Sequence, residues 1–156
     1  MWNGFGASGA ANVHDFHVCT YQGSDHLCFF QGNQENGYGR GQGLIMDNTY
    51  TVVNTVHTGN GATSADMHEF DLIGGGASAL MTMYMPVHHD LSTFGITSGQ
   101  GWIMEGCFQE VDTVTKDIIF DWRSLGHVDP SLSFVNPNTT EVSGDGLTKD
   151  TAWDYL

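Results

Sequence analysis

The stretch Asp66-Met67-His68-Glu69-Phe70 has an echo near the start of the chain, Val13-His14-Asp15-Phe16. Each stretch places a histidine, a carboxylate and a phenylalanine at the head of a run that is typical of a β-strand. His68 follows His14 by 54 residues (68 − 14 = 54), and the two phenylalanines are separated by the same interval. A repeat near fifty residues is the size of one propeller blade. We therefore expect the two histidines at equivalent places on successive blades, each on the strand nearest a shared axis.

Strand patterns after each stretch predict the rest of the architecture. The first blade is expected over residues 13–57, with a Gly-rich loop at 32–43, and the second over 66–123, with an insertion at 86–101. A long polar loop is expected at 124–152, and residues 153–156 read as the start of a third unit. The prediction is a single all-β domain over 1–156, made of about two four-stranded antiparallel blade-like sheets, which is a partial, open β-propeller.

The composition excludes several classes of function. Eighteen acidic residues against four basic ones give a formal charge of −14, so a basic surface for nucleic acid or an anionic membrane is not expected. No apolar stretch is long enough for a membrane-spanning helix, and the first residues do not form a signal peptide. The acidic, Gly-rich character and the sequon at Asn138 resemble a secreted protein.

The three cysteines, Cys19, Cys28 and Cys107, have no metal-binding spacing. We favour buried thiols that pack as small apolar groups. The alternative is a bond between Cys19 and Cys28, which lie on consecutive predicted strands. At least one thiol stays unpaired in either case.

The sequence predicts neither a metal site nor a cofactor. His88-His89-Asp90 invites a metal interpretation, but adjacent strand residues point to opposite faces, so a surface loop is the better hypothesis. Arg40 and Arg123 are expected on loops or outer strands, away from the shared axis.

Several motifs, in order along nearly the whole chain, resemble the fungal arylsulfotransferase (ASST-type) family of secreted β-propeller proteins. The matching stretches include Gly23-Ser24-Asp25-His26-Leu27-Cys28-Phe29-Phe30-Gln31-Gly32, Asp66-Met67-His68-Glu69-Phe70, Gly101-Trp102-Ile103-Met104-Glu105-Gly106-Cys107-Phe108-Gln109-Glu110-Val111-Asp112, Phe120-Asp121-Trp122-Arg123-Ser124 and Trp153-Asp154-Tyr155.

The resemblance implies a PAPS-independent transfer of sulfate from a small aryl sulfate to a phenol, by way of histidines near the propeller axis. It makes His68 a candidate catalytic residue, and the repeat adds His14 as its equivalent. Glu69 and Asp66 become candidate substrate-binding residues, and as neighbouring carboxylates they would also fix the histidine tautomers. The family continues with a further histidine and an arginine beyond the position of Leu156. The resemblance therefore predicts a fragment that is inactive alone.

A second hypothesis comes from another class of protein. The same sequence suits a non-catalytic secreted β module that binds a glycan or a protein partner through its Trp- and Gly-rich loops, with Trp102 a candidate contact. Under either hypothesis, two blades cannot close into a ring, so we expect self-association through the open blade faces.

Overall fold

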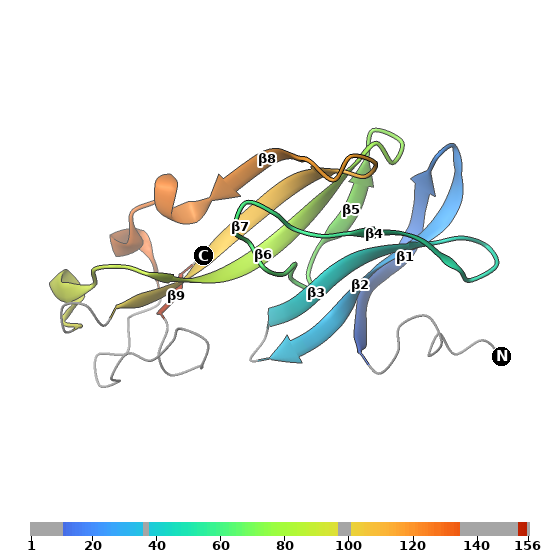
Figure 1. Cartoon of the computed structure of the whole chain (residues 1–156). Coiled ribbons are helices and arrows are strands. Elements are labelled where there is room, and N and C mark those ends of the chain that lie inside the picture. The colour runs from blue at the N-terminus through green and yellow to red at the C-terminus, as the bar shows by residue number, and fades with distance from the viewer. Residues whose placement is uncertain (1–10, 36–37, 97–100, 135–152, 156) are drawn as a thin grey trace. The chain divides into compact units, whose positions relative to one another are not determined.

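The computed structural model describes residues 11–35, 38–96, 101–134 and 153–155. The chain is all-β, as its sequence predicts, and forms two successive four-stranded antiparallel sheets (Figure 1). The first sheet has the order β1-β2-β3-β4, and neighbouring strands are also consecutive in the chain. Its strands are β1 (Asn12–Tyr21), β2 (Ser24–Glu35), β3 (Tyr38–Met46) and β4 (Val52–Val56).

The second sheet repeats this meander in the order β5-β6-β7-β8. Its strands are β5 (Phe70–Ile73), β6 (Ser78–His88), β7 (Trp102–Asp112) and β8 (Ile118–Arg123). Residues Trp153–Tyr155, expected to open a third unit, form β9 and pair in parallel with β7. The third unit itself stays a prediction.

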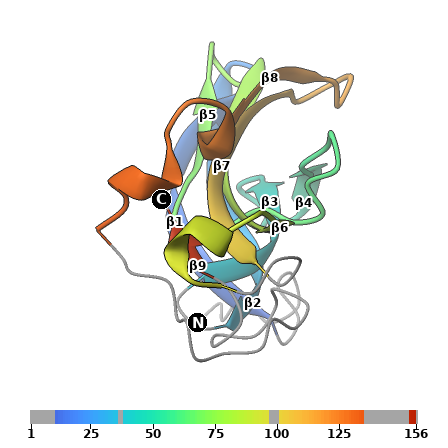
Figure 2. The ribbon, with the colours of Figure 1, turned by 90° about the vertical axis from the view of Figure 1, so that its left-hand side faces the viewer.

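Helical structure in the described residues is confined to short 3₁₀ turns (Figure 2). These turns are Ser92–Phe94, Ser124–Gly126 and Pro130–Leu132. None of them has the length or hydropathy that crossing a membrane as a helix requires. Part of the expected long loop, including the sequon at Asn138, lies outside the described residues.

The described chain divides into two compact units, each with its own core. The first unit is drawn from Met1–Met83 and Phe108–Trp122, and the second from Tyr84–Cys107 and Arg123–Leu156. The first core contains side chains from both sheets, among them Phe30, Ile45, Val56, Phe70, Met81 and Val111. The second core centres on Leu91 and Ile103.

The prediction of a loop at residues 32–43 is wrong, because most of them belong to β2 and β3. Gly39, Gly41 and Gly43 alternate along β3 and therefore share one face of the sheet. A Cβ at Gly43 would lie 2.1 Å from the ring of Phe70, so only glycine leaves room there for this core side chain. The glycines thus mark close packing on a strand rather than a flexible connection.

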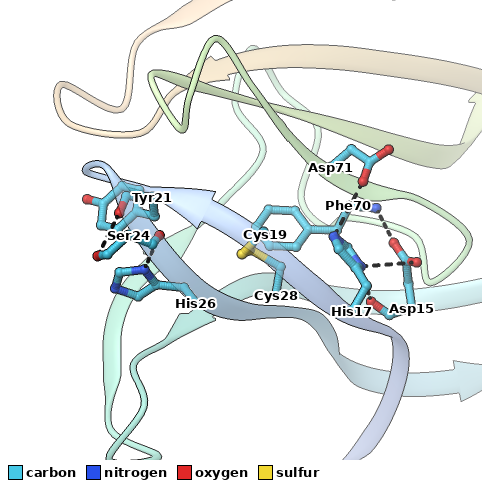
Figure 3. The surroundings of a disulfide bond; sticks show 9 residues. All are labelled: Asp15, His17, Cys19, Tyr21, Ser24, His26, Cys28, Phe70 and Asp71. Atoms are coloured by element: carbon cyan, nitrogen blue, oxygen red, sulfur yellow. Dashed lines mark hydrogen bonds and ion pairs between the residues drawn. A yellow bond between two sulfur atoms is a disulfide. The ribbon is translucent and has the colours of Figure 1, made fainter.

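The preferred interpretation of Cys19 and Cys28 as thiols is also wrong, because they form a disulfide (Figure 3). The β1–β2 register places Cys19 opposite His26 and Cys28 opposite His17, so the bond runs diagonally between the strands. Their Cα atoms are 5.8 Å apart, within the usual range for a disulfide. Both sulfur-bearing residues are buried in the first core.

Candidate functional site

His68 lies on a two-residue extrusion at the start of the second sheet. Thr82 of β6 closes the base of this extrusion. Its carbonyl accepts from the Asp66 N–H at 2.7 Å, and its own N–H donates to the Glu69 carbonyl at 3.5 Å. Regular pairing of β5 with β6 begins one residue later, at Phe70. Met67 and His68 are therefore displaced from the ladder, as in a β-bulge that redirects a side chain.

The carboxylate of Asp66 fixes the orientation of the His68 ring. Asp66 is fully buried, whereas the His68 side chain is 53% exposed. Oδ2 of Asp66 accepts from the backbone N–H of His68 at 3.1 Å and contacts Nδ1 of the same ring. Because an ionised carboxylate is only an acceptor, Nδ1 must carry the hydrogen in this contact. Nε2 is then the nitrogen at which the ring exchanges a proton or contacts a ligand.

The other carboxylate oxygen anchors Asp66 to the first sheet. Oδ1 accepts from the N–H of Gly39 in β3 at 2.5 Å. Ala65, the preceding residue, exchanges two backbone hydrogen bonds with Gly41, at 2.9 and 3.0 Å. A Cβ at Gly39 would lie 2.7 Å from the Met67 nitrogen, so the glycine face of β3 admits this segment. The backbone that presents His68 is thus fixed by both sheets.

Glu69 belongs to a different cluster from Asp66, although both flank His68 in the sequence. Burial and the neighbouring carboxylate of Asp71 raise the pKa of Glu69, Asp15 raises it further, and His17 acts in the opposite direction. Asp15 Oδ2 accepts from the N–H of Phe70 at 2.8 Å. Figure 3 shows His17 between Asp15 and Asp71, with Nε2 at 3.4 Å from Asp71 Oδ1.

A model of the family described as Arylsulfotransferase (ASST) matches residues 17–156, which is most of the chain. The chain belongs to the arylsulfotransferase (ASST) family. Neither a curated protein nor a solved structure matches it. Membership confirms the resemblance found in the sequence at the level of the family, and it implies aryl substrates and an arylsulfotransferase-like function.

His14 stands just before the part of the chain that matches the arylsulfotransferase family. It lies within β1, opposite Phe30, and its ring centroid is 6.2 Å from that of Phe30. The register of β1 shifts after His14, and the bulge falls on Asp15 and Phe16, where Asp15 has a φ of 53°. In the described contacts the structure brings Asp66 together with His68, and Glu69 together with Asp15, but it does not bring His14 to either group. The catalytic role of His14 stays a prediction.

The repeat at 54 residues is therefore not matched residue by residue. Phe70 is buried in the first core, whereas Phe16 is 51% exposed and packs on Phe29. The first sheet has its bulge within β1, directly after His14, whereas His68 lies in the extrusion that precedes β5. The residue spacing therefore does not fix which side chains of the two sheets are equivalent.

Other polar groups of this arylsulfotransferase-family chain have structural partners. Arg40 lies on β3, not in a loop, and donates to the Tyr38 hydroxyl at 3.1 Å. Asp90, which follows His88 and His89, accepts from the N–H of Ser92, and this hydrogen bond lowers the pKa of Asp90. Among the described residues, no group of histidines, cysteines and carboxylates has the arrangement of a metal site.

Sequence reasoning missed His17 and Asp71 as members of the candidate site. The position of His17 could not be predicted, because the bulge at Asp15 changes which residues of β1 face the second sheet. Asp71 directly follows Phe70, so its position two residues after Glu69 was the available signal in the sequence. Their contact joins β1 to β5, a pairing that no local pattern encodes.

Proposed function

We propose that His68 binds the sulfuryl group of an aryl sulfate during its PAPS-independent transfer to a phenol. The observation that carries this proposal is the buried carboxylate of Asp66, which holds Nδ1 of an exposed imidazole. A protonated ring held in this way offers its Nε2–H to a sulfate oxygen, and the Asp66 carboxylate compensates its positive charge. Such a donor stabilises the charge that develops on peripheral oxygens in the transition state.

The transfer exchanges one sulfur–oxygen bond for another. The bond between sulfur and the donor's aryl oxygen breaks, and a bond to the acceptor's phenolic oxygen forms. The acceptor's proton ends on the phenol that is released, so charge and atoms balance. In this scheme Asp66 is a positioning residue, because it acts through the His68 ring rather than on the substrate.

Binding of 4-nitrophenyl sulfate or inorganic sulfate to ¹⁵N-labelled protein tests the proposal directly. We expect the ring signals of His68 to shift as the anion is added, and the shift to weaken when the ring loses its proton, because only the protonated ring donates from Nε2. His68→Gln should abolish the response. His57→Gln is the matched control, since His57 is another exposed histidine, located just after β4. Signals of His57 that shift as much as those of His68 would contradict a specific site.

Turnover is a separate measurement. The sequence predicts that these 156 residues do not transfer sulfate by themselves, and incubation with 4-nitrophenyl sulfate and a phenol tests that prediction. Sulfated phenol formed by the wild type but not by His68→Gln would support the site and contradict the expectation of inactivity. The expected self-association through open blade faces likewise stays a prediction.

We further infer that the chain folds in an oxidising compartment and is secreted. The support is the disulfide between Cys19 and Cys28, because such bonds persist outside the reducing cytosol. Titration of thiols in denatured, unreduced protein from the native source should find one thiol per chain, that of Cys107, instead of three.

A further inference from the structure

Both ring nitrogens of His17 face hydrogen-bond acceptors. Nδ1 lies 2.8 Å from the carbonyl oxygen of Asp15, and Nε2 lies 3.4 Å from Oδ1 of Asp71 (Figure 3). A neutral imidazole carries a single N–H and can satisfy one of these acceptors. The imidazolium carries two N–H groups and a positive charge, so Nδ1 donates to the Asp15 carbonyl while Nε2 forms an ion pair with the Asp71 carboxylate at 3.4 Å. The surroundings of His17 therefore match its protonated form.

In the part of the chain that the structure describes, three carboxylates from three segments interact with His17. Asp15 is on β1, with Oδ1 at 3.5 Å from Nδ1, and Asp71 is on β5. Glu69, in the segment before β5, is the third carboxylate. On β2 the residue opposite His17 is Cys28, which is held in the disulfide and carries no charge. Burial and Asp71 raise the pKa of Glu69, as expected where carboxylates crowd together.

This cluster holds the chain directly after His68. Asp15 accepts from the N–H of Phe70, and His17 faces Asp71, so β1 contacts the two residues at which the extrusion rejoins the second sheet. The other end of the extrusion is held by Asp66 and Thr82. The conformation of the two displaced residues depends on both attachments.

We propose that His17 is a positioning residue for His68, and that its protonation clamps β1 to the segment from Glu69 to Asp71. When the ring gives its proton to solvent, it can no longer donate from both nitrogens, and the three carboxylates lose the positive charge of His17. The attachment of Phe70 and Asp71 to β1 then weakens, and the extrusion that presents His68 loosens. The relevance of this clamp to sulfate transfer rests on the proposed function, whereas the clamp itself does not.

Amide hydrogen exchange at Phe70 and His68 measures the two attachments separately. We expect the protection factors of both amides to fall by about threefold when a rise in pH removes the ring proton, the size of effect that a half-exposed ion pair supplies. In His17→Gln the protection should be low and independent of pH. Asp71→Asn leaves the ring of His17 in place and removes only its carboxylate partner, and it should flatten the pH dependence in the same way.

His26→Gln is the matched control for His17→Gln. The ring of His26 makes the same bond to the carbonyl two residues earlier, with Nδ1 at 3.0 Å from the oxygen of Ser24, but it lies at the far end of the same hairpin (Figure 3). We expect wild-type exchange at Phe70 in this variant. Should His17→Gln fail to fold, Asp71→Asn decides the question, because Asp71 is half exposed.

The outcomes separate the clamp from the proposed function. The clamp is overturned if the protection factor of the Phe70 amide does not change with pH in the wild type. It is also overturned if that protection factor changes with pH in Asp71→Asn as much as it does in the wild type. A response at Phe70 without one at His68 overturns the positioning role. If both amides respond but sulfate leaves the His68 signals unchanged, the clamp holds and the proposed function fails. If sulfate shifts those signals while exchange is independent of pH, the proposed function stands without the clamp.

Discussion

Replacing Asp66 by asparagine tests how the His68 ring is held. The asparagine oxygen can still accept from the Gly39 N–H, but an NH₂ group would take the place of Oδ2, which now faces two N–H groups of His68. The backbone N–H of His68 loses its acceptor. The ring is expected to switch to the tautomer with hydrogen on Nε2, so that Nδ1 accepts from the new amide.

The cost to stability follows from the same contacts. Two bonds to a carboxylate are lost, and each is worth about 1.5–3 kcal/mol when fully buried. The His68 ring is half exposed, so its bond to Asp66 contributes less to stability than a buried one. Removing the buried charge of Asp66 also lowers the desolvation cost of folding, which offsets part of the lost stability. We expect the free energy of unfolding to fall by about 2 kcal/mol, balancing these contributions.

Urea denaturation measures the change in stability, and ¹⁵N chemical shifts of the His68 ring report its tautomer. Asp47→Asn is the control, because Asp47 also accepts three hydrogen bonds, from Thr49 and Thr51, but does so in an exposed turn through a single oxygen. An amide oxygen can keep all three, so this variant should lose much less stability than Asp66→Asn. The reasoning is refuted if Asp66→Asn is as stable as wild type and still has its ring hydrogen on Nδ1.

Three further substitutions test other contacts of the fold. Gln109→Met keeps the side-chain volume but removes two part-buried hydrogen bonds to Gly59, at 2.9 and 3.0 Å, and should lower the free energy of unfolding in urea by about 2 kcal/mol. A loss below about 0.5 kcal/mol would show that water replaces these bonds. Gly43→Ala places a methyl group 2.1 Å from the ring of Phe70 and should lower the free energy of unfolding by about 2–4 kcal/mol. Gly23→Ala is the control, because Gly23 has open space around it and the variant loses only the roughly 1 kcal/mol that its positive φ imposes. Equal losses in the two variants would contradict the packing argument. Glu69→Gln should be more stable than wild type by about a few tenths of a kcal/mol at pH 7. The reason is that an acid whose pKa is raised on folding contributes stability at low pH, and this contribution is lost as the pH rises through that pKa. If the variant gains no stability at pH 7 relative to pH 4, the ionised Glu69 side chain is not disfavoured.

The strand content of the fold could be predicted from the sequence because apolar alternation and turn residues are local signals. The meander from β5 to β8 follows from such signals, as does the turn at Gln22 and Gly23. The Gly-rich segment was misread because glycine weakens strand propensity, while its alternation with Tyr38, Arg40 and Gln42 has the period of a strand. Period was the better guide there than composition.

The candidate site was predictable in part. Asp66 and His68 are two residues apart, so their pairing lies within the reach of one local turn. The contact of His17 with Asp71 depends on how two sheets approach each other and on a bulge in β1, which hydrophobic patterns do not specify. The disulfide was underestimated for a related reason, because thiol pairing depends on a diagonal register between strands.

The glycine face of β3 also determines the register in which this strand can pair. Sliding this strand by a single residue would turn Tyr38, Arg40 and Gln42 toward Phe70 and the segment that precedes it. No space exists there for a guanidinium group, since even a methyl carbon at Gly43 meets the phenylalanine ring. The glycines of β3 thus fix the register of its hairpin, because only this alignment leaves room for Phe70 and Met67 to pack on the strand.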